Sequence, residues 1–200
     1  MNPFARRGDP HLLAVSMTGV KMGERVAFVG CAHGGRLAAV AAKVGLSGRA
    51  VAIVPDRASA ERVRKGAAQA GVLVEIEVAS PTELPIEDAS IDLAVVDDTS
   101  GLLGLMHLDE RVVSVRELAR ILRPAGRAIL IGTAPRAGLR RLLTGAQSGP
   151  PFAASGAANQ ALEADGFGGV RTLAEREGLV FVEGIKPRAL SPVLDTPVMP

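Results

Sequence analysis

The segment from Arg25 to Asp56 constrains the fold more than any other part of the chain. It begins with the apolar run RVAFV, passes through a turn that contains Gly30, Gly34 and Gly35, and continues with apolar residues at helical spacing and a second apolar run. A buried strand, a glycine turn, a helix and a second strand in this order are typical of a parallel α/β sheet. Glycine lets a ligand approach the backbone, and the following helix aims free amide groups at that ligand. The segment therefore predicts a nucleotide-binding type of fold.

Strands and helices continue to alternate as far as residue 132. Further strands are expected at residues 72–78, 91–96 and 127–132, with helices at residues 60–71 and 108–122 and a loop at residues 80–90. Such alternation favours a mainly parallel sheet that is covered by helices on both faces.

The last third of the chain departs from this alternation. Residues 133–159 are rich in Gly, Ala, Ser and Pro, and we expect a short helix there, followed by a mobile connection or lid. Another short helix is expected at residues 161–166. Two strands at residues 170–174 and 179–185, separated by a loop of hairpin length, then finish the sheet with an antiparallel pair.

Length and composition are those of one globular domain. The chain has 200 residues and 48% hydrophobic content, enough for one full core, so we expect a single domain over residues 1–200. Residues 1–21 are expected to form an N-terminal helical or cap segment. This segment lacks a signal-peptide cleavage site, so we interpret it as a mature N-terminus. No apolar run reaches the ~20 residues of a membrane span, and no membrane partner is expected.

Charge, aromatic content and cysteine content limit the partners and the location. The 23 basic residues nearly balance the 21 acidic ones, and the chain has no Trp or Tyr on which bases could stack, so we expect no nucleic-acid partner. Cys31 is the only cysteine, which excludes an intrachain disulfide and makes the cytoplasm the default location. With only His11, His33 and His107 as further nitrogen ligands, we expect no metal site.

Several phrases carry a family resemblance when they are taken in order. They are VGCAHGG at residues 29–35, ELPIEDASIDLAVV at residues 83–96, MHLDE at residues 106–110, VRELARILRPAGRAILIG at residues 115–132 and LEADGFGGVRTLAEREGLVFVEGIKP at residues 162–187. In this order they resemble the class I S-adenosylmethionine-dependent methyltransferases, particularly the small-molecule type. The resemblance implies an α/β, Rossmann-like, mainly parallel seven-stranded sheet with helices on both faces and a C-terminal antiparallel hairpin. It also implies S-adenosylmethionine as cofactor and a small-molecule methyl acceptor.

The resemblance further implies the residues of a cofactor site. The positions that correspond to the family's ligand loops are Gly30, Cys31, Ala32, Gly34, Pro55, Asp56, Arg57, Ser80, Pro81 and Asp97. Asp56 takes the place of the acidic residue that accepts hydrogen bonds from the ribose hydroxyls, and Ser80 that of the residue facing the adenine amino group. Asp97 ends a strand at the edge where open α/β sheets bind ligands.

Some of these positions depart from the family's pattern. Phe28 stands where the family usually has an acidic residue that organises the methionine end of the cofactor, and Ala32 stands in place of a glycine. Asp56 comes slightly late after its strand, so either the loop shifts or the side chain is solvated. A hydrogen bond to a charged partner is worth ~1.5 to 3 kcal/mol, so unreplaced losses would weaken binding strongly. The alternative function is therefore a methyltransferase-like fold that has lost the cofactor and serves as a binding or assembly module.

Other candidate residues leave two interpretations open. His107 follows the fourth strand, where it could take a proton from a substrate or cap the next helix. His33 and Cys31 could flank a ligand or be ordinary turn residues, and Asp98 could line a pocket or be solvated. No catalytic residue is predicted, because in-line methyl transfer depends chiefly on alignment and desolvation. A nicotinamide-dependent enzyme ranks last, because the turn lacks the G-x-G-x-x-G spacing.

Overall fold

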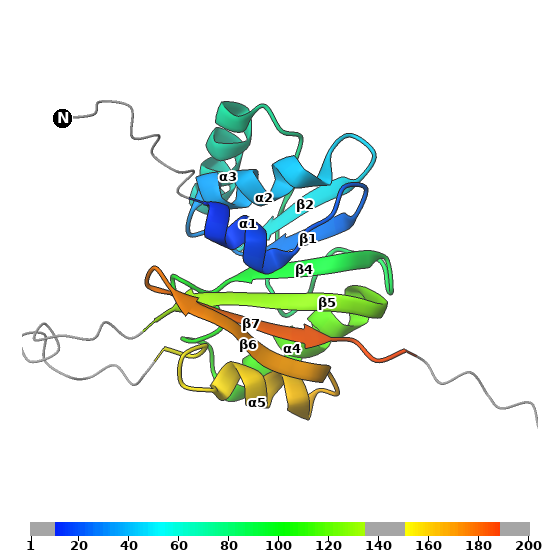
Figure 1. Cartoon of the computed structure of the whole chain (residues 1–200), viewed down its shortest axis with the longest axis vertical. Helices are drawn as coiled ribbons and strands as arrows, with labels where there is room; N and C mark the ends of the chain where they lie inside the picture. The colour runs from blue at the N-terminus through cyan, green and yellow to red at the C-terminus, as the bar shows by residue number, and fades with distance from the viewer. Residues whose placement is uncertain (1–10, 135–150, 189–200) are drawn as a thin grey trace, which may run out of the picture.

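The computed structural model describes residues 11–134 and 151–188. Within these ranges the strands are β1 (Arg25–Val29), β2 (Arg49–Val54), β3 (Glu75–Val78), β4 (Ile91–Asp97), β5 (Leu122–Thr133), β6 (Gly168–Arg176) and β7 (Leu179–Ile185), and the helices are α1 (Leu12–Thr18), α2 (Gly34–Val44), α3 (Arg57–Ala70), α4 (Leu108–Ile121) and α5 (Ala157–Ala164). These strands form one seven-stranded sheet in the order β3-β2-β1-β4-β5-β7-β6 (Figure 1).

The first five strands of the chain run parallel to one another, and the last two form the antiparallel end of the sheet. β1 lies between β2 and β4, with β3 beside β2 and β5 beside β4, and all four of these pairings are parallel. β7 pairs with both β5 and β6 in antiparallel orientation. The predicted fold class, with its C-terminal hairpin, is confirmed.

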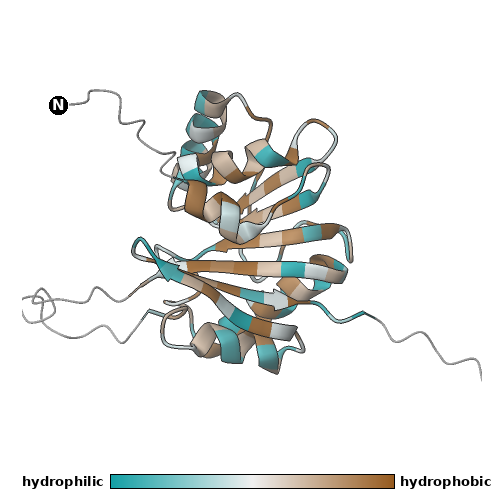
Figure 2. Cartoon of the chain, viewed as in Figure 1, coloured by the Kyte–Doolittle hydropathy of each residue, from teal (hydrophilic) through white to brown (hydrophobic). Residues whose placement is uncertain are grey.

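Helices cover both faces of the sheet (Figure 1). On one face, α1, α2 and α3 enclose a core that includes Phe28, Val40 and Val63. On the other face, α4 and α5 enclose a core that includes Val115 and Leu162. Because successive strand residues point to opposite faces, both cores draw on the same central strands. Figure 2 shows the hydrophobic residues concentrated along these strands.

Several element boundaries differ from the sequence-based predictions. β3 begins at Glu75 instead of residue 72, because Gly71 ends α3 with a φ of 65° and Val72 donates its N–H to the carbonyl of that helix at Ala67, at 3.0 Å. β5 begins earlier than predicted, because Leu122 already pairs with Ile91 ahead of a shift in register. α3 begins at Arg57 rather than at residue 60, and α5 begins at Ala157, inside the predicted connection.

Two of the predicted segments extend beyond the described residues. α1 lies within residues 1–21, where a helical segment is expected, but residues 1–10 fall outside the described part. Residues 135–150, which make up most of the predicted mobile connection, also fall outside it. Among the helices that are described, none has the length and apolar character required to cross a membrane.

Candidate cofactor site

The glycine turn lies at the carboxyl edge, which is the edge where the parallel strands β1 to β4 end. Val29 pairs with Ile53 on β2 and with Val96 on β4, so Gly30 lies beside the end of β4 at Asp97. Gly30 has a φ of 80°, a left-handed conformation that favours glycine, and its N–H donates to the Ile53 carbonyl at 2.8 Å. The turn therefore has the backbone geometry that its sequence predicts.

Asp97 is a buried carboxylate at the centre of this edge. Its Oδ2 accepts a hydrogen bond from the Ala32 N–H at 3.1 Å, and its Oδ1 accepts one from Nη1 of Arg36, also at 3.1 Å. The backbone N–H and the hydroxyl of Thr99 donate to Oδ1 at 3.2 and 2.5 Å. The Arg36 and Asp97 side chains are each 11% exposed. A largely buried ion pair thus links the end of β4 to the start of α2.

Leu102 lies directly against the glycine turn. A Cβ atom placed on Gly30 would lie 2.7 Å from Cδ2 of Leu102 and 3.1 Å from the carbonyl oxygen of Asp97. The cavity found beside the turn has a volume of about 10 Å³, close to the least that holds a single water. It is lined by Phe28, Gly30, Arg36, Leu37, Val40, Val95, Asp97 and Ile131. At Gly30 the turn is therefore packed against side chains of its own chain, whereas His33 and Arg36 line a separate cavity of about 230 Å³.

The β4–α4 loop, residues 98–107, carries Leu102 and is held from within by Asp98. The Asp98 carboxylate is buried and accepts hydrogen bonds from the N–H groups of Leu103 at 2.7 Å and Gly104 at 3.0 Å. Burial raises the pKa of Asp98 above its ordinary value, against the lowering effect of these two donors. Asp98 is thus buried and anchors its own loop, so it does not occupy a solvated turn position.

Arg111 on α4 holds the same loop from the side. Its guanidinium lies over the ring of Phe152, 4.7 Å from the ring centre. It also donates hydrogen bonds to three carbonyl oxygens of the loop, those of Leu103 at 2.9 Å, Gly104 at 3.2 Å and Met106 at 3.0 Å. These bonds anchor the loop backbone from Leu103 to Met106, directly after Leu102.

The start of α2 packs against α3 with the two backbones in contact. A Cβ atom on Gly34 would lie 2.1 Å from the Arg62 carbonyl oxygen, and one on Gly66 would lie 2.4 Å from the carbonyl carbon of Gly34. Nε of Arg62 also donates to the Cys31 carbonyl at 3.1 Å, which ties the turn to α3. Gly34, a predicted cofactor contact, thus has a packing role.

Asp56, Ser80 and Pro81 follow β2 and β3 at the carboxyl edge. Asp56 is the N-cap of α3: its carboxylate accepts the Ser59 N–H at 2.6 Å, and this bond holds the pKa of Asp56 below its ordinary value. The Ser80 hydroxyl lies 2.7 Å from that of Thr82 and accepts the Thr82 N–H at 3.2 Å. Pro81 is buried, whereas the exposed residues here are Pro55, Asp56, Arg57 and Ser80.

Comparison with known protein families shows to which family this chain belongs. The sequence profile of the family described as methyltransferase domain matches residues 28–130, just over half of the chain. The chain belongs to the methyltransferase domain family. S-adenosylmethionine is therefore the implied cofactor. An uncharacterized 37.1 kDa protein in transposon TN4556 of Streptomyces fradiae is 32% identical over 108 residues, which is 54% of this chain and 30% of that protein. This methyltransferase domain thus matches less than a third of the length of that curated relative.

Solved structures share the fold of this methyltransferase domain. A SAM-dependent methyltransferase from Aquifex aeolicus has a TM-score of 0.68 at 20% identity, with 89% of this chain and 94% of that chain covered. The [4+2]-cyclase SpnF has a TM-score of 0.63 at 16% identity, with 90% and 80% covered. At such identities the likeness establishes the fold alone, and a fold can support several activities.

The two ends of this methyltransferase site differ in how well they fit the cofactor. At the nucleoside end, Asp56 and Ser80 offer exposed oxygen acceptors of the kind that ribose and adenine groups require. At the amino-acid end, Phe28 is 2% exposed and packs in the core below α2. The Ala32 N–H is bonded to a carboxylate, and Leu102 lies over the turn. Where the family resemblance expects the nucleoside, the described residues offer exposed surface acceptors; where it expects the amino-acid end, Ala32 and Asp97 bond to each other.

The cysteine and histidine candidates have local explanations in this methyltransferase domain. Burial, reinforced by the Asp97 charge, raises the pKa of the Cys31 thiol to about 11, so the thiol stays protonated at neutral pH. His107 is the N-cap residue of α4, and its backbone N–H donates to the Glu110 carboxylate at 3.3 Å, which favours the capping interpretation. His33 is exposed as the N-cap of α2. The described residues contain no group of three metal-binding side chains.

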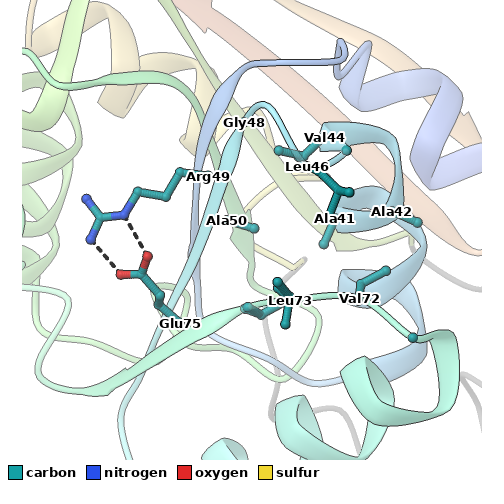
Figure 3. Close-up of a pocket in the computed structure, with 13 residues that line it drawn as sticks. Ala41, Ala42, Val44, Leu46, Gly48, Arg49, Ala50, Val72, Leu73 and Glu75 are labelled. Atoms are coloured by element: carbon teal, nitrogen blue, oxygen red, sulfur yellow. Dashed lines mark hydrogen bonds and ion pairs between the residues drawn. The ribbon is translucent and has the colours of Figure 1, made fainter.

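A cavity of about 570 Å³ lies at the other end of β2, away from the cofactor edge of the methyltransferase domain (Figure 3). It is lined mainly by apolar side chains, which include Ala41, Val44, Leu46, Val72 and Leu73. Arg49 and Glu75 lie at its rim and pair with each other through hydrogen bonds of 2.9 and 2.5 Å (Figure 3). Ligands of open α/β sheets bind at the carboxyl ends of the strands, so this cavity lies away from the edge where the cofactor is expected.

Three residues that were not predicted from the sequence also shape the site: Arg36, Leu102 and Arg111. Arg36 meets Asp97 across 61 residues of sequence, and neither residue type nor spacing signals such a partner. The contact of Leu102 with Gly30 likewise depends on the path of a loop. The one sign in the sequence is that Arg36 is a basic residue in the first turn of the helix that follows the glycine turn.

Proposed function

We propose that this protein is an S-adenosylmethionine-dependent methyltransferase that acts on a small-molecule acceptor. The proposal is carried by one observation: the glycine turn after β1 and the exposed oxygen acceptors after β2 and β3 lie at the same edge of the sheet. Family membership supports the reaction. The near balance of charges and the lack of Trp and Tyr favour a small acceptor over a nucleic acid. A single domain over residues 1–200, a cytoplasmic location and the absence of a membrane partner belong to the same proposal.

Residues at different positions of the site have different roles in the proposed function. The cofactor, when bound, supplies an activated methyl group for in-line transfer. Asp56 accepts hydrogen bonds from the ribose hydroxyls, and Ser80 faces the adenine amino group. Asp97 orders the turn through the Ala32 N–H, and the β4–α4 loop excludes water from the edge. We assign no general base, because alignment and desolvation of the reacting atoms suffice for this chemistry.

Titration calorimetry with S-adenosylhomocysteine tests this proposal. We expect a dissociation constant below ~1 mM for the wild-type chain, weakened about tenfold by Asp56→Asn, because asparagine keeps the N-cap of α3 but loses the charged acceptor. Glu61→Gln is the matched control, since it removes the same charge from an exposed position on the same helix and should leave affinity unchanged. Absence of heat at millimolar ligand contradicts the proposal.

The alternative function is a binding or assembly module that has lost the cofactor. The packing of Leu102 on Gly30 and the bond between the Ala32 N–H and Asp97 favour it, because both occupy the turn with the chain's own atoms. Ser80→Asp separates the two functions, because it restores an acidic acceptor at an exposed position without disturbing a core. Binding that appears only in this variant supports the alternative, whereas binding already present in the wild type supports the methyltransferase.

A further inference from the structure

A second cavity at the carboxyl edge, of about 230 Å³, lies between α1, the start of α2 and the turn that joins β6 to β7. This turn belongs to the carboxyl edge, because Leu179, which follows it, pairs with Thr133 at the end of β5. Arg36 lines this cavity and also the small cavity beside Gly30. The larger cavity therefore lies next to the glycine turn.

The cavity and the nucleoside acceptors lie on opposite sides of β1. Asp56 and Ser80 follow β2 and β3, which are on one side of β1 in the sheet, whereas β5 and β7 are on the other side. The strand order thus suits a ligand whose nucleoside contacts Asp56 and Ser80 and whose 5′ substituent crosses the glycine turn. The cavity exceeds several times the ~30 Å³ that one water occupies in the liquid, so it has room for a small polar head group.

The cavity offers groups of both charges to such a head group. Glu177 is exposed, and within the part of the chain that the structure describes its carboxylate forms no ion pair. Arg36 bonds Asp97 and Thr99 through Nη1, at 3.1 and 3.3 Å. Because a guanidinium carries five N–H donors in a planar fork, Arg36 can bond a second carboxylate without releasing Asp97. An ammonium and a carboxylate on one carbon match this pair of groups.

Glu177 has a backbone conformation that its residue type disfavours. Glu177 and Gly178 form a two-residue turn between the paired residues Arg176 and Leu179, and their φ angles are 56° and 76°. Asparagine, aspartate or glycine is favoured at the first position of such a turn. The Ala134 N–H holds the turn by donating to the Gly178 carbonyl at 2.9 Å. A glutamate here is a local cost of the kind that accumulates at functional sites.

We infer that this cavity binds an α-amino-acid head group, and that the head group is the amino-acid arm of the bound nucleoside. The Glu177 carboxylate accepts hydrogen bonds from the ammonium, and the Arg36 guanidinium donates to the carboxylate. Phe28 supplies no carboxylate at the turn, and the charge of Asp97 is already matched by Arg36. This inference rests on the proposed function, because it assumes that an adenine nucleoside binds at this edge.

Paired calorimetric titrations of the full chain test the assignment. The probes are S-adenosylhomocysteine, which carries the amino-acid arm, and 5′-methylthioadenosine, which lacks it. We expect the wild type to bind S-adenosylhomocysteine about tenfold more tightly or better. Glu177→Gln should weaken S-adenosylhomocysteine about tenfold while methylthioadenosine changes less than about threefold. Glu175→Gln is the matched control: it removes the same charge from an exposed position of the same hairpin, outside the cavity, and should change neither.

Two further variants separate a lost contact from a damaged fold. Glu177→Asn removes the carboxylate but suits the left-handed turn, so S-adenosylhomocysteine should bind as weakly as it does to Glu177→Gln while the melting temperature stays the same or rises. Arg36→Lys keeps a positive charge beside Asp97 but loses the planar fork, so it too should weaken S-adenosylhomocysteine more than methylthioadenosine.

L-methionine distinguishes the arm of the nucleoside from a free amino acid. We expect no binding of L-methionine to the chain saturated with S-adenosylhomocysteine, because the arm fills the cavity. Binding to that complex which Glu177→Gln abolishes assigns the cavity to a free amino acid and overturns the inference. A wild type without preference for S-adenosylhomocysteine, or equal losses in Glu177→Gln and Glu175→Gln, also overturns it but leaves the proposed function standing, because the nucleoside still binds. If neither nucleoside binds any of the proteins, the proposed function itself fails, and this inference with it.

Discussion

Phe28 shows why one residue of the site departs from its family's pattern. Its ring is 2% exposed and belongs to the core below α2, so the position serves packing. The carboxylate beside the turn comes from the neighbouring strand instead: Phe28 pairs with Val95, and Asp97 lies two residues further along β4. The Asp97 carboxylate thus lies beside the glycine turn, although no local sequence pattern indicates that contact.

Phe28→Asp should destabilise the fold instead of restoring a cofactor contact. The substitution buries a carboxylate among apolar side chains, and we expect a loss of about 3 kcal/mol or more in the free energy of unfolding, measured by urea denaturation. Phe28→Leu is the control and should cost about 1 kcal/mol. A Phe28→Asp protein as stable as the wild type would show that this side chain reaches solvent.

Asp98→Asn should gain stability over the wild type as the pH rises. Burial raises the folded pKa of Asp98 above 3.8, its ordinary value, so stability from this group is present below that value and is lost as the pH rises through the folded pKa. Asparagine does not titrate and keeps an oxygen acceptor for the loop. The difference in unfolding free energy should therefore grow as the pH rises from about 4 through the folded pKa of Asp98, and then level off. Asp109→Asn, an exposed control on α4, should give a nearly flat difference, and a flat result for Asp98→Asn refutes the prediction.

At the scale of elements, the contact between α2 and α3 organises the site. The two helices meet where Gly34 and Gly66 allow backbone to touch backbone, and Arg62 of α3 holds the Cys31 carbonyl. α3 itself begins at the Asp56 cap. Residues that were predicted as cofactor contacts therefore also join two helices, which fixes where the turn lies relative to the ends of β1 and β2.

Gly66→Ala should destabilise the protein, although helix propensity alone predicts the opposite. Alanine in a helix interior is favoured over glycine by about 1 kcal/mol, but here its Cβ would lie 2.4 Å from the backbone of Gly34. We expect a net loss of about 2 kcal/mol or more in chemical denaturation. Gly168→Ala, whose Cβ would find its nearest neighbour at 3.9 Å, should change stability by less than about 1 kcal/mol. A stabilising Gly66→Ala would mean that the helices separate easily.

At the scale of the whole molecule, one sheet unites early and late parts of the chain. β7, near the end of the described residues, pairs with β5 from Arg127↔Ile185 to Thr133↔Leu179. Phe181 of β7 lies in the α2 core, while Val182 lies in the α4 core. Neither core is complete without strands from both halves of the chain.

Thermal unfolding should therefore be a single cooperative transition. Because both cores share the central strands, melting one removes the support of the other, and the calorimetric and van't Hoff enthalpies should agree. Differential scanning calorimetry of the full chain measures both. Two resolved transitions would refute the expectation of a single domain.

The sequence by itself determined the order and type of the elements, and through them the fold and the family. Periodicity and glycine turns are local properties, so the segment from Arg25 to Asp56 already implied a strand, a turn, a helix and a strand. Boundaries such as the start of β3 shifted, because capping bonds at Gly71 compete with strand pairing.

Only the tertiary structure determined which side chains contact the glycine turn. The bonds of Asp97 to Arg36 and Ala32, and the packing of Leu102 on Gly30, join segments more than 60 residues apart. Such contacts depend on strand order and loop path, which no local pattern encodes. The sequence thus predicted a cofactor edge, and the fold determined which side chains of the protein bond to and pack against its glycine turn.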